Sequence, residues 1–256
     1  MTTTLRFDIR AQPDNTTCGP TCLYAIYRYF DDPIALSRVI ADVPMLEGGG
    51  TLSVYLASHA LRRGYQTTII PYNLQIFDPT WSNVPPGDIA EKLRRQRAIK
   101  QGLPGFERLT DAYLEYLLLG GRLKFEVLTA ALIRKYLNRG IPIMTGRSAT
   151  YLYNSAREYD RDGRVVYDDV RGDSVGHFVV LAGYSRESRC ALVADPFLPN
   201  PMADGQHYSV DIYRLLCAIM LGILTNDGDL LIIQPKRGRP KRGQTKQRRK
   251  DGFRQV

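Results

Sequence analysis

A cysteine stands at the point where a helix is predicted to begin. The segment from Gln12 to Cys18 leads into residues 18–30, where Leu23, Ile26 and Phe30 recur at helical spacing. The free N–H groups and the dipole at a helix N-terminus lower the pKa of a thiol, and the thiolate is the nucleophilic form of cysteine. Cys18 is therefore a candidate thiol nucleophile.

Hydrogen-bond donors for a reaction at this thiol can be placed from the same segment. Gly19 and Pro20 follow Cys18, and we expect them to leave the first helical turn open to an approaching acyl carbon. The backbone N–H of Cys18 is then free to donate to a developing oxyanion. Gln12, six residues earlier across an irregular turn, supplies a second candidate donor from its side-chain amide.

The sequence holds three histidines as candidate general bases. His177 opens the apolar run 177–184, which we expect to be a strand buried on both faces. A histidine at the end of such a strand projects from a rigid base, so His177 is the favoured base. His207, at the start of another predicted strand, is its rival, whereas His59 falls within a helix.

A carboxylate follows this strand in the sequence. The polar turn 185–189 joins the strand to residues 190–194, which predicts an antiparallel hairpin. If the turn centres on Glu187, His177 lies opposite Phe197 and diagonal to Asp195, on one face and within reach of a hydrogen bond. Asp195 would then orient the imidazole and stabilise its protonated form. A centre half a residue away would put the two on opposite faces.

Each assignment has a structural alternative. His177 can be a hydrogen-bonded core histidine, and Asp195 can be a turn residue before a proline. Asp168, Asp169 or Asp173, which precede His177, can also reach its ring in place of Asp195. The catalytic interpretation rests on coincidence, because the cysteine at a helix start, the earlier glutamine and the histidine strand followed by an aspartate occur together in one chain.

The elements that position these residues are mostly helical in the first half of the chain and mostly extended in the second. We expect helices over residues 18–30, 33–41, 51–63, 88–100, 109–119, 126–138 and 211–221, with Thr17 and Thr51 as candidate N-caps. We expect strands over residues 65–70, 141–145, 164–167, 177–184, 190–194, 207–210 and 230–234. This order predicts an α+β fold in which an N-terminal helical lobe with the nucleophile packs against a C-terminal antiparallel β-sheet.

Composition limits the class of protein. The 256 residues are 44% hydrophobic, enough to bury a core, and no run of 18 apolar residues occurs, so we expect a soluble, cytoplasmic protein. The net charge of +9 belongs to residues 236–256, which hold ten Lys or Arg and one Asp and leave 25 basic and 25 acidic residues in the rest. The body therefore has no overall electrostatic bias towards nucleic acid.

The remaining cysteines give no indication of a metal site. Cys22, Cys190 and Cys217 form no paired zinc spacing with Cys18, and each lies among apolar residues. We therefore expect three small buried hydrophobic side chains, and neither a metal nor another cofactor.

The motifs resemble those of the C39-like peptidases, a group within the papain-like superfamily. The resemblance rests on Gln12, Asn15-Thr-Thr-Cys18-Gly-Pro-Thr-Cys-Leu23, Gly176-His177-Phe-Val-Val-Leu and Ala194-Asp195-Pro196. It implies a papain-like fold, with Gln12 in the oxyanion hole and Cys18 as the nucleophile. It also implies that His177 is the base and Asp195 its orienting partner.

Two departures from that family matter. Its best-known members are leader-peptide proteases fused to membrane transporters, and this chain shows neither membrane spans nor a P-loop, so we expect a stand-alone form. The stretch between Cys18 and His177 is also much longer, and within it residues 71–110 look like an insertion or the wall of a lobe. Cleavage after a double-glycine leader is therefore not carried over.

These observations predict a hydrolase that cleaves a peptide or isopeptide bond through a thioester acyl-enzyme on Cys18. An acyltransferase would use the same residues. A non-enzymatic, nucleic-acid-associated protein with a papain-like interaction module is the alternative from another class. A catalytically inactive relative is disfavoured, because all four site residues are present.

The basic tail is a separate feature. Residues 1–235 are expected to form one domain, and residues 236–256 to be disordered. Within the tail, Arg237, Gly238, Arg239 and Pro240 resemble the core of an AT-hook, which lies along an A·T minor groove. A solvated basic tail that contacts any polyanion accounts for the same residues. Besides a peptide substrate, weak DNA or polyanion contact is thus the partner that the sequence suggests, and no membrane is expected.

Overall fold

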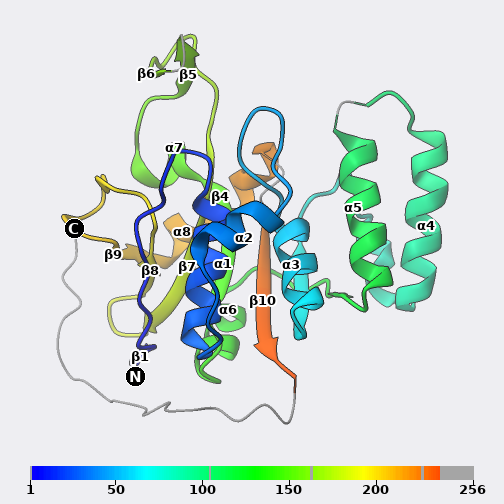
Figure 1. The fold of residues 1–256 in the computed structure, drawn as a ribbon, viewed down its shortest axis with the longest axis horizontal. Helices are drawn as coiled ribbons and strands as arrows, with labels where there is room; N and C mark the ends of the chain where they lie inside the picture. The colour runs from blue at the N-terminus through cyan, green and yellow to red at the C-terminus, as the bar shows by residue number, and fades with distance from the viewer. Residues whose placement is uncertain (1, 104, 162–163, 226–227, 237–256) are drawn as a thin grey trace.

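The fold is described by a computed structural model for residues 2–103, 105–161, 164–225 and 228–236. Within these residues, eight strands form one sheet in the order β3-β2-β10-β4-β7-β8-β9, with β1 paired to β7 (Figure 1). The pairs are antiparallel except for β2 with β3. The strands of this sheet are β1 Thr2–Thr4, β2 Tyr65–Pro71, β3 Arg122–Leu123, β4 Ile143–Ser148, β7 Gly176–Ser185, β8 Cys190–Ala194, β9 His207–Asp211 and β10 Asp229–Pro235.

Helices cover both faces of this sheet. The α-helices are α1 Cys18–Tyr29, α2 Leu36–Asp42, α3 Ser53–Arg62, α4 Pro86–Ile99, α5 Phe106–Leu118, α6 Ala130–Leu137, α7 Ala149–Tyr153 and α8 Ile212–Leu221. Phe178 and Val180 of β7 enter a core with α1 and α3, while Val179 and Leu181 enter a second core with α6 and α8. The α+β class is confirmed, and so is a central strand buried on both faces, because helices pack on both sides of the sheet.

The helix that carries Cys18 begins where expected, but its cap differs from the prediction. Thr17 occupies the N-cap position of α1, yet its hydroxyl donates to the carbonyl of Asp14 (3.4 Å) instead of accepting from the first turn. Thr51 is not the cap of α3 either, because its hydroxyl donates to the carbonyl of Pro44 (2.6 Å). Both threonine hydroxyls thus bind carbonyl groups of preceding loops. Because Thr17 does so, the N–H groups at the start of α1 have no side-chain cap.

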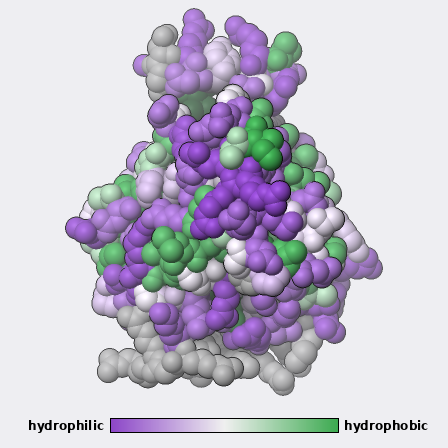
Figure 2. Space-filling view, turned by 90° about the vertical axis from the view of Figure 1, so that its right-hand side faces the viewer, coloured by the Kyte–Doolittle hydropathy of each residue, from purple (hydrophilic) through white to green (hydrophobic). Residues whose placement is uncertain are grey.

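Residues 71–110 contain the 3₁₀-helix η1 Pro79–Asn83, the helix α4 and the start of α5. Helices α4 and α5 stand as a pair at one side of the molecule, beyond α3 (Figure 1). The face that this side presents is mostly hydrophilic, with apolar side chains scattered over it (Figure 2). Whether this segment is an insertion or a lobe wall stays a prediction.

Several elements have no counterpart in the sequence-based prediction. They are β1, β3, α7, η1, a second 3₁₀-helix η2 (Gly222–Thr225) and strand β5 (Glu158–Arg161), which pairs with the expected β6 (Arg164–Tyr167). Across the four described stretches, no helix is long and apolar enough to span a membrane. The AT-hook-like segment lies outside the described residues.

Candidate active site

The Cys18 thiol lies at the first residue of α1, against the first residues of β7. Cys18 is 7% exposed, and so is His177. Burial by itself would raise the pKa of the thiol, but the charge of His177 and a hydrogen bond with it act against burial, as do the backbone groups of Phe178 and Gly19. The pKa of Cys18 is therefore lowered from its ordinary value, as a thiol nucleophile requires.

The residues next to Cys18 hold α1 against the sheet. A Cβ atom on Gly19 would lie 2.6 Å from Cγ2 of Thr51, so only glycine fits this contact. Gly19 and Pro20 are themselves buried, and the open path to the sulfur that they were expected to leave stays a prediction. Cys22, one turn later, is fully buried as expected, and its Sγ donates to the carbonyl of Phe178 (3.3 Å).

His177 and Asp195 are in direct contact, with 2.8 Å between Nε2 and Oδ1. The turn between β7 and β8 is centred half a residue beyond Glu187, because Ser185 pairs with Cys190. That register alone would place the two side chains on opposite faces. A bulge between Leu181 and Gly183 adds one residue to β7 and restores the predicted face.

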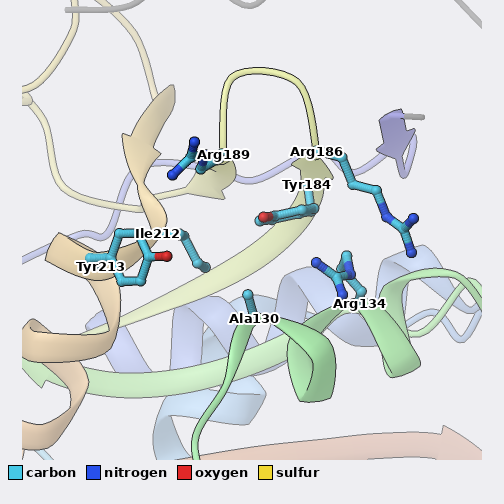
Figure 3. A pocket seen from close by; sticks show the side chains of 7 residues that line it. All are labelled: Ala130, Arg134, Tyr184, Arg186, Arg189, Ile212 and Tyr213. Atoms are coloured by element: carbon cyan, nitrogen blue, oxygen red, sulfur yellow. The ribbon is translucent and has the colours of Figure 1, made fainter.

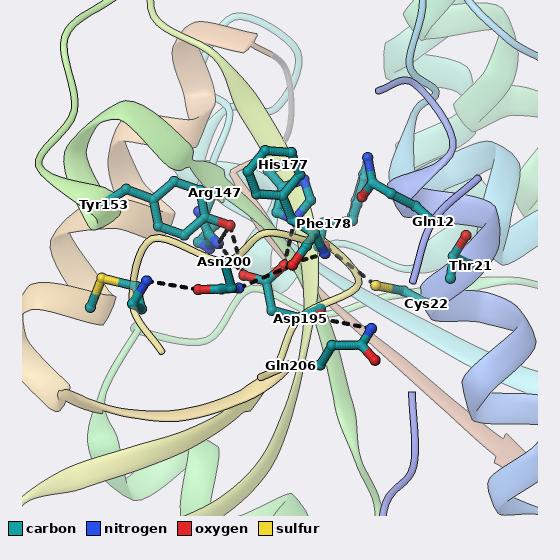
Figure 4. A network of polar contacts seen from close by, with 12 residues as sticks. Gln12, Thr21, Cys22, Arg147, Tyr153, His177, Phe178, Asp195, Asn200 and Gln206 are labelled. Atoms are coloured by element: carbon teal, nitrogen blue, oxygen red, sulfur yellow. Dashed lines mark hydrogen bonds and ion pairs between the residues drawn. The ribbon is translucent and has the colours of Figure 1, made fainter. Parts of the chain in front are cut away.

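Besides His177, three side chains and one backbone N–H donate hydrogen bonds to the carboxylate of Asp195. Its Oδ2 accepts from Nη2 of Arg147 (3.0 Å) and from the hydroxyls of Tyr153 (2.7 Å) and Tyr208 (2.8 Å). Its Oδ1 accepts from the backbone N–H of Phe197 (3.0 Å) as well as from His177. Figure 4 shows Arg147, Tyr153 and His177 converging from different elements on the one carboxylate. Asp195 and Arg147 are both fully buried.

In this cluster, His177 and Asp195 each shift the pKa of the other towards its charged form. Burial would lower the pKa of His177, but the carboxylate of Asp195 and the thiol of Cys18 raise it to about 9. Burial would raise the pKa of Asp195, but His177 and Arg147 hold it well below its ordinary value. Since Nε2 of His177 contacts Asp195, Nδ1 is the nitrogen left for the thiol. The pKa shifts of Cys18 and His177 are both in the direction that favours a thiolate beside an imidazolium.

No protein-family model matches the sequence, and no curated protein matches it either. The chain is similar over 92% of its length to a solved structure described as a C39-like peptidase from Bacillus anthracis, with 12% identity, 98% of that chain covered and a TM-score of 0.45. It is also similar over 92% to xylellain, a cysteine protease from Xylella fastidiosa, with 15% identity, 86% of that chain covered and a TM-score of 0.43.

Gln12 lies beside this cluster but is engaged elsewhere. Its backbone N–H donates to the carbonyl of Pro196 (2.9 Å), which ties the segment before Cys18 to the segment after Asp195. Its side-chain Nε2 donates to the carbonyl of Asp14 (2.7 Å). An amide nitrogen carries two hydrogens, so one of them remains for another acceptor. The predicted role of Gln12 as an oxyanion donor stays a prediction.

The rival residues are occupied elsewhere. Nε2 of His207 lies 2.9 Å from the carbonyl oxygen of Phe7, and Nδ1 of His59 lies 2.7 Å from the hydroxyl of Tyr27. Asp168 accepts from the backbone and side chain of Arg171 within its own loop.

In the described part of the chain, the carboxylates of Asp169 and Asp173 do not contact His177, whose partner is Asp195. Cys190 is buried as expected. Cys217 is exposed, contrary to the prediction, because it lies on the outer face of α8, whose inner face is formed by Leu215 and Ala218.

Sequence reasoning missed Arg147, Tyr153 and Tyr208. The predicted strand 141–145 ended at the glycine that follows it, but β4 continues to Ser148 and so includes Arg147. Tyr153 belongs to α7, a helix of five residues with no predicted counterpart. A single arginine directly after a buried apolar run was the one available indication, since a buried charge requires a partner.

Proposed function

We propose that the protein is a cysteine-nucleophile hydrolase that cleaves a peptide or isopeptide bond through a thioester acyl-enzyme. The observation that carries the proposal is the chain of contacts from Cys18 to His177 to Asp195 at the start of α1. Through these contacts, the pKa of the Cys18 thiol is lowered and the pKa of the His177 imidazole is raised. A base oriented by a third group next to a nucleophile is the arrangement that covalent catalysis requires.

The reaction follows from these protonation states. The Cys18 thiolate attacks the carbonyl carbon, and the tetrahedral oxyanion accepts from the backbone N–H of Cys18 and from the amide of Gln12. The His177 imidazolium gives its proton to the leaving nitrogen as the C–N bond breaks, which leaves a thioester and a neutral imidazole. His177 then takes a proton from water as the water oxygen attacks the thioester, and the C–S bond breaks to release a carboxylic acid and to restore the Cys18 thiolate beside the imidazolium.

Arg147 and Asp195 take no part in bond making in this scheme. Asp195 keeps the imidazole in one orientation and stabilises its protonated form. Arg147 keeps the carboxylate of Asp195 ionised within a dry environment. They are positioning residues.

A cleavage assay tests the proposal. The full chain is incubated with a library of peptides and lysine-linked isopeptides, and the products are identified by mass. We expect cleavage that Cys18→Ala lowers by at least roughly 10³-fold, while Cys217→Ala, which removes the exposed cysteine, leaves the rate unchanged. Equal rates for the wild type and Cys18→Ala would contradict the proposal.

An amine acceptor distinguishes hydrolysis from acyl transfer, which uses the same residues. With glycinamide added, a hydrolase gives mainly the free acid, whereas an acyltransferase gives mainly the glycinamide adduct. We expect the acid. An adduct that dominates at low millimolar glycinamide would replace hydrolysis by transfer and leave the role of Cys18 intact.

A further inference from the structure

A hollow of about 450 Å³ lies at the opposite end of β7 from the candidate active site. It is bounded by α6, by the turn between β7 and β8, and by the start of α8 (Figure 3). Tyr184 forms part of it, seven residues along the strand from His177, or roughly 23 Å at 3.3 Å per residue. The hollow is therefore a site separate from Cys18.

Three arginines face this hollow: Arg134 from α6, and Arg186 and Arg189 from the turn. In Figure 3, Arg134 and Arg186 lie on one side of the Tyr184 ring and Arg189 on the other. In the described stretches of the chain, none of the three has a carboxylate within ion-pair distance. Like charges from separate elements repel one another, so an anion between them would be stabilised.

Two acidic residues, Asp211 and Glu187, lie close to the hollow but do not line it. The carboxylate of Asp211, at the start of α8, accepts from the backbone N–H groups of Tyr213 and Arg214. Glu187 lies in the turn itself, but it does not line the hollow. Because the body of the chain carries equal numbers of acidic and basic residues, this excess of positive charge is a local property of the hollow.

The remaining walls are apolar or aromatic. Tyr184 and Ile212 are buried, Ala130 is half-buried, and Tyr213 is 62% exposed at the rim. The guanidinium of Arg134 lies 5.3 Å from the centre of the Tyr184 ring, which holds it over the aromatic face. The hollow thus combines an apolar surface with three arginines along its walls, and its volume falls within the range of small-molecule sites.

Guanidinium groups pair in a planar, two-pronged way with phosphate oxygens, and three of them suit a ligand with two or more negative charges. We propose that this hollow, the arginine pocket, binds a small phosphorylated molecule that also carries a planar or apolar body, such as a nucleoside diphosphate. The phosphates would contact Arg134, Arg186 and Arg189, and the body would lie against Tyr184 and Tyr213.

Isothermal titration of the full chain tests this assignment, with ADP, inorganic pyrophosphate and adenosine as probes. The pocket variant is Arg134→Gln with Arg189→Gln. The matched control is Arg248→Gln with Arg249→Gln, which removes the same charge from the basic tail. We expect ADP to bind more tightly than pyrophosphate and adenosine not to bind measurably, since both the charge and the ring contribute.

The variants decide where the probe binds. The pocket variant should lose at least tenfold in ADP affinity, and the tail variant should stay within twofold of the wild type. Absence of ADP binding to the wild type, equal losses in the two variants, or pyrophosphate that binds as tightly as ADP would each overturn the assignment. Unchanged melting temperatures and unchanged Cys18 alkylation rates would show that both variants are folded.

Discussion

Arg147 and His177 face each other across the β4–β7 pair, and their side chains meet at one carboxylate, that of Asp195. Paired residues of antiparallel strands point to the same face, so the pairing itself directs both groups to Asp195. Among the described residues, the Arg147 guanidinium donates hydrogen bonds through Nη2 alone. Its Nε and Nη1 atoms have no hydrogen-bond partner there. The contribution of Arg147 is therefore one buried positive charge at one position.

Removing that charge should raise the pKa of Cys18. With Arg147→Met, the cluster of thiolate, imidazolium and carboxylate carries a net negative charge, which disfavours the thiolate. We expect the pH profile of Cys18 alkylation to move to higher pH by about one unit or more, and stability to fall by about 3–5 kcal/mol. Arg147→Lys, which keeps the charge, should retain most of the wild-type profile. A folded Arg147→Met protein with an unmoved profile would count against the account.

Gln12 should affect turnover but not the reactivity of the thiol. If its free amide hydrogen stabilises the oxyanion, Gln12→Ala lowers kcat by roughly 10²–10³-fold, because one donor is lost only in the transition state. The rate of Cys18 alkylation should stay the same, since no oxyanion forms there. Asn15→Ala, an exposed change in the same turn, serves as the control. Parallel losses in turnover and alkylation would instead assign Gln12 to the shape of the loop.

Asp229 makes stability fall as the pH rises. This buried carboxyl group accepts a hydrogen bond from Ser53 (2.8 Å), and burial raises its pKa to about 7. The native state therefore keeps a proton that the unfolded chain releases near pH 4, and stability declines by up to about 1.4 kcal/mol per pH unit between these values. Asp229→Asn, compared with Asp88→Asn on the exposed face of α4, should remove this decline in urea unfolding at pH 5 and pH 8. An unchanged slope with pH would show that Asp229 is ionised in the native state.

The sequence predicted those parts of the site that depend on local pattern. The start of α1 at Cys18 and the buried strand of His177 follow from helical spacing and an apolar run. Contact between His177 and Asp195 was predicted for a turn centred on Glu187, and it occurs for another reason, the bulge at Ala182. A bulge depends on how β7 meets its neighbours, and a single sequence shows no pattern for it.

The fold departed from the prediction where distant segments meet. Strand β2 pairs with β3 and β10 near one edge of the sheet, so a strand of the helical half joins the strands of the C-terminal half. Arg147 becomes a buried partner of Asp195 because β4 runs past its glycine alongside β7. The position of β2 and the burial of Arg147 both depend on tertiary strand pairing, which local sequence propensity does not indicate.

The most direct test of the central claim is alkylation of the purified protein with iodoacetamide near pH 6, with the modified cysteines mapped by mass. An ordinary thiol is almost fully protonated at this pH, so the exposed Cys217 is the internal reference. We expect Cys18 to react at least ten times faster than Cys217, and His177→Ala to abolish that advantage. If Cys18 reacts no faster than Cys217, or if its rate is the same in His177→Ala, Cys18 is not the activated nucleophile that the site geometry implies.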